Sequence, residues 1–182
     1  LRSPVHLESS KDGSLEHFLI GFFKRIRPQD WIAVTYRNHL YALLKGMPPD
    51  ELKQWIRDNK SIHLMSEKYR IISSAIVGGH LPEAVGIAMG IKLRGDDEYV
   101  YAFLGDMCFE SGIAHECIKY ARRNNLPITF IVTDNGLSTD TNTQEAWGKE
   151  EGGPNVVRIS YKRKFAHYGP SLEGEKREIA KF

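Results

Sequence analysis

Two continuous apolar runs with one helical segment between them constrain the fold of this chain most strongly. Residues 99–104 (YVYAFL) and 128–133 (ITFIVT) show no alternation of polar and apolar side chains, which is typical of strands covered on both faces of a parallel sheet. Residues 112–123 between them have the length and pattern of a helix. This order predicts a βαβ unit, and hence an α/β domain with a parallel sheet. Its right-handed crossover places the C-terminal ends of both strands at the same edge of the sheet.

The composition is that of one ordinary globular domain. The 182 residues are 41% hydrophobic, and the formal net charge is only +2. No strong field therefore draws the chain to nucleic acid or to a membrane, and residues 18–23 (FLIGFF) are too short an apolar stretch to span a bilayer. The two cysteines, Cys108 and Cys117, lack the spacing of a metal finger, so we expect packed thiols in a reducing, cytoplasmic compartment.

The rest of the chain predicts further elements around this unit. We expect a polar N-terminal arm over residues 1–13 and a single domain over residues 14–182. The apolar spacing predicts a strand over residues 31–36 and helices over residues 14–27, 40–45, 50–58 and 82–94. Gly86 and Gly90 lie one turn apart in the last helix, and we interpret them as a site of close helix packing rather than of ligand contact.

Acidic and amide residues follow both apolar runs. The first run continues into Gly105-Asp106 and the second into Asp134-Asn135. Open α/β sheets bind ligands beyond the carboxyl ends of their strands, and carboxylate and amide oxygens suit magnesium or calcium rather than zinc. We expect the helix over residues 112–123 to point its positive N-terminal end into the same crevice. The pattern indicates a metal–diphosphate site; the alternative is that these residues only form turns, which they also favour.

Three common motifs are absent from the sequence. No G-x-G-x-x-G follows a predicted strand, and neither G-x-x-x-x-G-K-[ST] nor G-x-S-x-G occurs. A dinucleotide-binding fold, a P-loop nucleotidase and an α/β-hydrolase are therefore unsupported.

Gly105-Asp106 followed by Asn135 resembles the motif of the thiamine-diphosphate-dependent superfamily, which reads Gly-Asp-Gly and, one crossover later, Asn-Asn. Four further segments occur in the same order as in one branch, the alpha subunit of the 2-oxo acid dehydrogenases: residues 36–39 (YRNH), 61–64 (SIHL), 76–82 (IVGGHLP) and 93–96 (LRGD). The resemblance covers roughly residues 30–142, with transketolases as more distant relatives. It implies a three-layer α/β domain whose mostly parallel central sheet is flanked by helices.

The resemblance also implies a set of cofactor and metal contacts. Asp106 and Asn135 would be side-chain ligands of Mg²⁺, with the backbone carbonyl of Leu137 as a third ligand. The guanidinium fork of Arg37 suits the diphosphate because it is always charged and matches phosphate oxygens bidentately. The positions implied to bind thiamine diphosphate are Tyr36, Arg37, His39, Ala75, Val77, Gly105, Asp106, Met107, Cys108 and Asn135.

Four histidines have both functional and structural interpretations. His63 is our candidate catalytic residue, for contact with substrate or phosphate, with an ordinary loop histidine as the alternative. His39 either shapes the diphosphate pocket or is a hydrogen-bonded structural residue. His80 fits a structural role beside its helix, and His167 matches the family only loosely.

The sequence departs from the family pattern in three ways. Met107 stands where the motif has its second glycine, and only glycine allows unrestricted φ and the closest backbone approach. Asp134 replaces the first asparagine of the Asn-Asn pair and adds negative charge near the metal. The chain is also about half as long as the family's usual members.

The resemblance implies that the cofactor acts as a carbanion equivalent on a 2-oxo acid or ketose, and that a pyrimidine-binding domain activates it. Nothing in the sequence resembles that domain, so we expect a separate beta-like partner chain, in a heterotetramer. Dehydrogenase, transketolase and decarboxylase chemistry all remain open. Two other hypotheses are a catalytically inactive relative with a scaffold or regulatory role, and an unrelated flavodoxin-like binding domain with chance matches.

Overall fold

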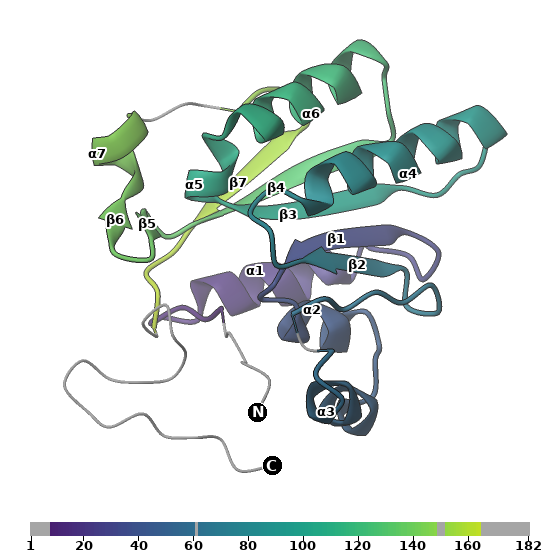
Figure 1. Cartoon of the computed structure of the whole chain (residues 1–182), viewed down its shortest axis with the longest axis horizontal. Helices are drawn as coiled ribbons and strands as arrows, with labels where there is room; N and C mark the ends of the chain where they lie inside the picture. The colour runs from purple at the N-terminus through teal and green to yellow at the C-terminus, as the bar shows by residue number, and fades with distance from the viewer. Residues whose placement is uncertain (1–7, 61, 149–151, 165–182) are drawn as a thin grey trace.

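A five-stranded parallel sheet forms the centre of the computed structural model, which describes residues 8–60, 62–148 and 152–164 (Figure 1). The strand order is β2-β1-β3-β4-β7, and all four neighbouring pairs are parallel. The strands are β1 (Trp31–Thr35), β2 (Ile71–Ser74), β3 (Val100–Gly105), β4 (Ile128–Asp134) and β7 (Val156–Ser160). The predicted α/β class with a mostly parallel sheet is confirmed.

Helices cover both faces of this sheet and complete three layers (Figure 1). On one face lie α4 (His80–Arg94), the short α5 (Asp106–Phe109) and α6 (Gly112–Arg123). On the other face lie α1 (Ser14–Phe23) and α2 (His39–Leu44), with α3 (Pro49–Arg57) outside α2. A hairpin of β5 (Leu137–Ser138) and β6 (Thr141–Asn142) leads into α7 (Thr143–Trp147).

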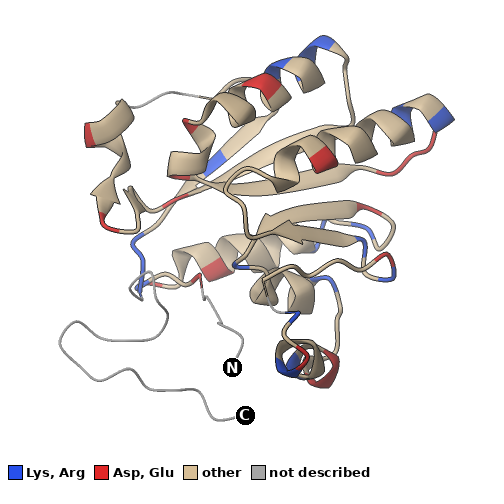
Figure 2. Cartoon of the chain, viewed as in Figure 1, with Lys and Arg blue, Asp and Glu red and all other residues tan. Residues whose placement is uncertain are grey.

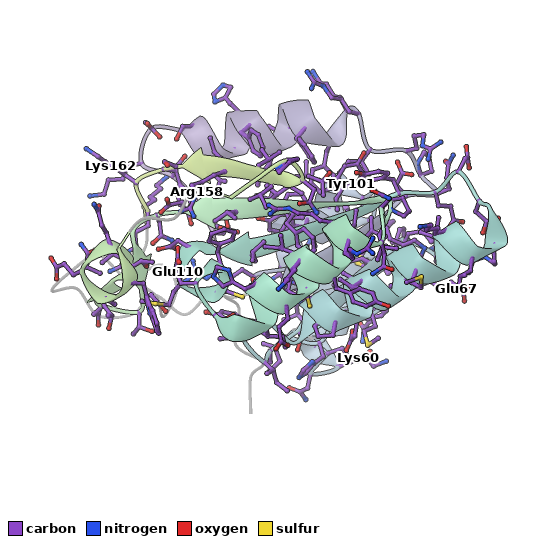
Figure 3. All side chains as sticks on the ribbon, turned by 90° about the horizontal axis from the view of Figure 1, so that it is seen from above. Lys60, Glu67, Tyr101, Glu110, Arg158 and Lys162 are labelled. Atoms are coloured by element: carbon purple, nitrogen blue, oxygen red, sulfur yellow. The ribbon has the colours of Figure 1, made fainter. Side chains whose placement is uncertain are left out.

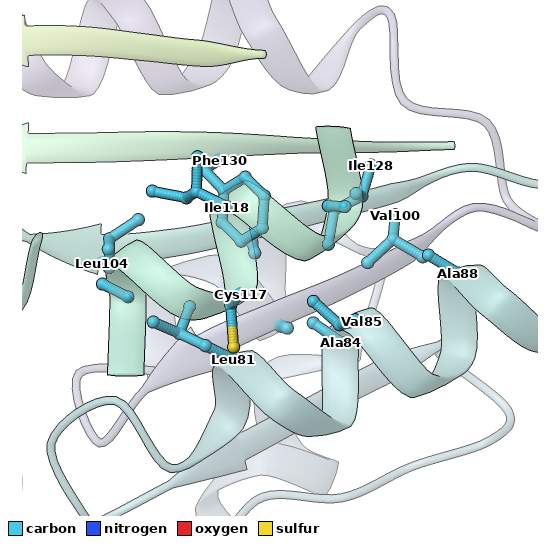
Figure 4. Close-up of a cluster of buried hydrophobic side chains, with 14 of the residues drawn as sticks. Leu81, Ala84, Val85, Ala88, Val100, Leu104, Cys117, Ile118, Ile128 and Phe130 are labelled. Atoms are coloured by element: carbon cyan, nitrogen blue, oxygen red, sulfur yellow. The ribbon is translucent and has the colours of Figure 1, made fainter. Parts of the chain in front are cut away.

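The central strand β3 is buried on both faces, as its unbroken apolar sequence predicts. Ala102 and Leu104 face the core under α4 and α6, where small residues of α4 let the helix approach the sheet (Figure 4). Phe103 faces the opposite core, and its ring centroid lies 5.8 Å from that of Phe23 and 4.8 Å from that of Tyr41. Side chains from one strand thus belong to both cores, which explains why polar residues are absent from its interior.

The two edge strands of the sheet, β2 and β7, are elements that the sequence pattern did not predict. β2 has only four residues, and β7 shows partial exposure along its length. Both are placed by pairing with a neighbour, as in the alignment of Phe130 with Val156. The predicted elements are all present; the first helix ends at Phe23 rather than at residue 27.

Part of the expected N-terminal arm is packed against the end of the sheet. Residues 1–7 lie outside the described residues, but Ser10 is 3% exposed and forms an antiparallel bridge with Arg163. The backbone N–H of Lys11 donates to the carbonyl of Lys162 at 2.9 Å. The segment from Glu8 onward therefore lies beside the chain that leaves β7.

Gly86 and Gly90 lie on the outer side of α4. A Cβ atom at Gly86 would meet nothing within 4 Å, and at Gly90 it would meet only the Arg94 guanidinium, at 3.3 Å. The prediction of close helix packing at these glycines is wrong within the described part of the chain. The prediction of packed thiols is confirmed, because Cys108 and Cys117 are both free and buried.

His80, the first residue of α4, is fully buried and acts as a structural residue. Its Nε2–H donates to the carbonyl of Phe103 on β3 at 2.8 Å, and Nδ1 has no hydrogen-bond partner within the described residues. Burial lowers the pKa of His80 from 6.5 to about 4, with the hydrogen bond to Phe103 opposing the shift. A charged imidazole is therefore strongly disfavoured in the folded state.

We expect acid to destabilise the protein through His80. Between pH 6.5 and about 4 the unfolded state binds a proton that the folded state does not, so stability falls as the pH falls across this window. The loss attributable to His80 is at most about 3 kcal/mol. Urea titrations from pH 7 to 4 should show a steeper decline for the wild type than for His80→Gln, which keeps an N–H donor. Parallel pH profiles would contradict the assignment.

Candidate active site

The ends of β3 and β4 bring the two predicted motif halves together. The strands are aligned with Leu104 opposite Val132 and Gly105 opposite Thr133. Asp106 and Asn135 therefore leave the sheet at the same edge, beside a pocket of about 100 Å³. Loops after β1, β2, β3 and β4 line it, as expected for a ligand site of an open α/β sheet.

Most of the predicted site residues line this pocket. They are Tyr36, Arg37, Val77, Gly105, Asp106, Met107, Cys108, Asn135 and Leu137. Ala75 is not among the lining residues, although its neighbours Ser74 and Ile76 are. His39 is 5% exposed at the start of α2 and also does not line the pocket.

One further histidine, His63, is not brought to the pocket in the part of the chain that the structure describes. His63 is exposed in the segment before β2 and is not one of the lining residues. His167 lies outside the described residues. The expected N-terminus of the long crossover helix is also not at the pocket. The short α5 comes first, and α6 begins at Gly112 with its N-terminus capped by the Ser111 side chain.

Asp106 is a buried carboxylate at the floor of the site. It is 2% exposed and accepts a hydrogen bond from the Thr143 hydroxyl at the start of α7. Burial raises the pKa of Asp106, the Thr143 hydrogen bond opposes this, and the charge of Asp134 raises the pKa further. Because its negative charge is poorly solvated, a bound cation would stabilise the ionised form.

Asn135 and Leu137, which carry an amide and a backbone carbonyl oxygen, line the same pocket. Asn135 Oδ1 accepts the backbone N–H of Leu137 at 3.0 Å, which closes a tight turn. Gly136, between them, has a φ of +74°, a left-handed conformation that suits glycine. With Asp106 these groups form a set of hard oxygen donors, as Mg²⁺ prefers.

The donor set fits a magnesium ion that is shared with a phosphate ligand. Within the described ranges, no group of three or more His, Cys, Asp and Glu side chains is placed to hold a metal. Magnesium does not need one, because it commonly uses one or two carboxylates and takes its other oxygens from water and phosphate. At Gly105, which lines the pocket, an added Cβ would meet no atom outside the neighbouring residues within 4 Å, so there is open space beside Asp106.

The departures at Met107 and Asp134 are accommodated. Met107 lies in the helical backbone of α5 and is not among the described residues with positive φ, so replacing glycine there causes no backbone strain. Arg158 of β7 donates from Nη1 to Asp134 Oδ2 at 2.9 Å, and its Nη2 lies 3.8 Å from Glu110 Oε1 (Figure 3). The arginine thus compensates the extra acidic charge next to Asn135.

Sequence reasoning missed three residues at the site because they come from distant segments: Glu8 and Tyr41 line the pocket, and Tyr161 bonds to Asn135. Glu8 Oε2 accepts a hydrogen bond from the Tyr41 hydroxyl at 2.7 Å, and Glu8 Oε1 accepts one from the Tyr161 hydroxyl at 3.1 Å. Burial raises the pKa of both tyrosines, and the negative charge of Glu8 raises it further. No local motif marks these residues.

Comparison with known proteins gives the family of this chain. The family model described as Dehydrogenase E1 component matches residues 11–152. The alpha-3 subunit of the pyruvate dehydrogenase E1 component, a chloroplastic protein of Arabidopsis thaliana, is 29% identical over 167 residues, which cover 80% of this chain and 38% of the relative. The alpha subunit of acetoin:2,6-dichlorophenolindophenol oxidoreductase from Cupriavidus necator is 28% identical over 147 residues, covering 75% and 43%.

A solved structure supports the fold. A Mycobacterium smegmatis protein described as a thiamin diphosphate-dependent enzyme has a TM-score of 0.52 and 16% identity, over 86% of this chain and 32% of that chain. The α/β architecture with a pocket at the carboxyl edge of its sheet is thus that of an E1-type domain. The chain belongs to the dehydrogenase E1 component family, and it spans about two fifths of the length of these curated relatives. The resemblance inferred from the motifs is confirmed, and a chance match of an unrelated flavodoxin-like domain is excluded.

We expect Arg158 to matter for stability because it neutralises Asp134. The side chains of Arg158, Asp134 and Glu110 are 19%, 18% and 7% exposed. Arg158→Gln should therefore cost about 2–4 kcal/mol in the free energy of unfolding. Adding Asp134→Asn removes the unpaired charge and should recover part of this loss. Urea unfolding of the two single variants and the double variant measures the coupling; strictly additive losses would show that the two residues do not act as a pair.

Proposed function

We propose that this chain binds thiamine diphosphate with Mg²⁺ and forms the alpha-type half of a 2-oxo acid dehydrogenase active site. The observation that carries the proposal is the convergence of Asp106, Asn135 and Leu137 with Arg37 around one pocket at the carboxyl edge of the sheet. Family membership favours dehydrogenase-type over transketolase-type chemistry. The two relatives described above are named for reactions on small carbonyl compounds.

The charge of the pocket makes binding of a diphosphate dependent on a metal. Among the described lining residues, Glu8 and Asp106 are acidic and Arg37 is the single cation of the Lys and Arg type. A diphosphate alone would therefore meet a site whose formal charge is negative. A divalent cation held by Asp106, Asn135 and the Leu137 carbonyl would reverse this balance, and Arg37 would bind the phosphate oxygens beside it.

The residues of this chain would hold and orient the cofactor. Once bound, thiamine diphosphate supplies a carbanion equivalent that adds to a substrate carbonyl. The loop after β2 forms the rim of the pocket, with Ile76 71% exposed and Val77 65% exposed. These apolar side chains suit contact with the ring system of the cofactor or with a second protein surface.

We propose that a separate pyrimidine-binding, beta-like chain completes the site. The pocket of about 100 Å³ is smaller than the roughly 300–1,000 Å³ of typical ligand sites. Both relatives described above are named as alpha subunits, which implies partner subunits for them. Our proposal for the assembly is two chains of each kind, a heterotetramer.

The distribution of charge and the length of the helices bear on which partners the chain can bind. Lys and Arg alternate with Asp and Glu around the molecule in the view of Figure 2, so no single sign covers this face. Every helix in the described ranges is too short or too polar to cross a membrane. The cytoplasmic location stays a prediction.

A second candidate function is that of an inactive relative with a scaffold or regulatory role. The observation that favours it is the Met107 side chain, which lines the pocket where the motif has glycine. This function and the enzymatic one differ in whether the pocket binds its cofactor, so a binding measurement separates them.

We expect thiamine diphosphate to raise the melting temperature only when Mg²⁺ is present. A ligand that binds the native state alone stabilises it by mass action, by about 2.7 kcal/mol at a concentration of 100 Kd. Asp106→Asn should abolish the shift, whereas Asp140→Asn should keep it, because Asp140 is 82% exposed and does not line the pocket. Thermal shift assays test this. No magnesium-dependent shift, with or without a beta-like chain, would contradict the proposal and favour the scaffold role.

We expect Ile76→Asp to weaken binding of the beta-like chain at least tenfold, because it places a charge in the apolar rim of the pocket. Leu93→Asp is the matched control, since Leu93 is 78% exposed near the C-terminal end of α4. Titration calorimetry with the co-purified partner measures both affinities. Equal affinities for the two variants, or substrate turnover by this chain alone, would contradict the proposed interface.

A further inference from the structure

A chain of three hydrogen bonds joins the N-terminal segment to the proposed metal ligand Asn135. Asn135 Nδ2 donates to the Tyr161 hydroxyl oxygen at 3.0 Å, and the Tyr161 hydroxyl donates to Glu8 Oε1 at 3.1 Å. The Tyr41 hydroxyl donates to the other oxygen of the same carboxylate at 2.7 Å. Glu8 is half-buried, and Tyr161 is 7% exposed.

The direction of each bond in this chain follows from chemistry. An ionised carboxylate only accepts hydrogen bonds, and a phenol carries a single hydrogen to donate. Because Tyr161 donates its hydrogen to Glu8, its oxygen is left to accept from the Asn135 amide. Only the nitrogen end of that amide can donate. Glu8 therefore determines, through Tyr161, which end of the Asn135 side chain faces away from Leu137.

The amide oxygen of Asn135 is consequently held on the side of Leu137. There Oδ1 accepts the Leu137 N–H at 3.0 Å and retains a second lone pair. A cation bound in the pocket would be coordinated through this second lone pair of Asn135 Oδ1. Leu137 constrains the oxygen end of the amide, and Tyr161 constrains the nitrogen end, so the side chain is fixed at both ends.

The local backbone holds Glu8 in place. Ser9 accepts at its carbonyl from the Lys164 N–H at 2.9 Å, and Lys11 donates to Lys162, so this segment pairs with the chain just after Tyr161. The Ser9 hydroxyl and the Ser10 backbone N–H both donate to the Glu16 carboxylate in α1. The two residues of the Glu8–Tyr161 hydrogen bond therefore lie on two segments that are paired with each other through their backbones.

We propose that Tyr161, oriented by Glu8, is a positioning residue that presents the amide oxygen of Asn135 to the divalent cation of the cofactor site. This inference rests on the proposed function, and it adds to the site two residues outside the thiamine-diphosphate motif. Tyr161 acts on the metal only through Asn135. Glu8 orients Asn135 through Tyr161 and also lines the pocket, so the N-terminal segment becomes part of the binding machinery.

The test measures how much Mg²⁺ is needed for the thermal shift at saturating thiamine diphosphate. Tyr161→Phe should raise the half-maximal Mg²⁺ concentration about tenfold, the effect of one hydrogen bond. Tyr99→Phe is the matched control, because the Tyr99 hydroxyl bonds to Thr129 Oγ1 on the same sheet at 3.1 Å but does not line the pocket. It should leave the Mg²⁺ requirement unchanged.

A double-variant cycle separates positioning from general loosening of the fold. Asn135→Asp places an oxygen at both ends of the side chain, so its orientation no longer matters. In this background Tyr161→Phe should cause no further rise in the Mg²⁺ requirement. A rise of the same size in both backgrounds would overturn the inference. A Tyr161→Phe variant that needs the same Mg²⁺ concentration as the wild type would also overturn the inference.

A measurement without metal or cofactor keeps this inference distinct from the proposed function. In the metal-free protein, the side-chain NH₂ protons of Asn135 should be protected from exchange with solvent, and Tyr161→Phe should remove this protection. Unprotected protons in the wild type would overturn the positioning role. If the wild type shows protected protons but no magnesium-dependent shift, the proposed function fails, and the role in presenting a metal ligand fails with it.

Discussion

The parallel pairing of β3 with β4 is the constraint on which the rest of the structure depends. Its register brings Gly105 opposite Thr133, so that Asp106 and Asn135 begin their loops at the same edge of the sheet. The pairing is held by residues that are buried on both faces, such as Phe103 and Phe130. A slip of one residue would reverse the faces of every side chain and separate the two halves of the motif.

Charge balance then decides what the edge of the sheet can bind. Arg158 of β7 compensates the acidic Asp134, which leaves Asp106 as the buried carboxylate with a raised pKa and an incomplete counter-charge. This charge balance is why we propose that a cation binds first and that an anionic cofactor binds through it. The charge balance of the pocket is compatible with the metal-dependent diphosphate binding that we propose.

Local patterns predicted the elements that are long or strongly apolar, and they did so for physical reasons. Residues 99–104 and 128–133 must be covered on both faces, and α4 shows the proline and glycine signals of helix ends. The edge strands β2 and β7 carry weak local signals because β2 has only four residues and β7 is partly exposed along its length. The functional interpretation of His63 came from the resemblance alone, and His63 is not among the residues that line the described pocket.

By itself, the sequence determined the α/β class and placed Asp106 and Asn135 after two strands whose carboxyl ends share one edge of the sheet, because the crossover of a βαβ unit is right-handed. The structure decided that these two strands are direct neighbours. Only the tertiary structure decided which side chains surround them. Glu8, Tyr41 and Tyr161 come from three distant segments, and they meet because the N-terminal segment pairs with the chain after β7. Such contacts join residues that are far apart in the sequence, and the local spacing of polar and apolar residues carries no information about them.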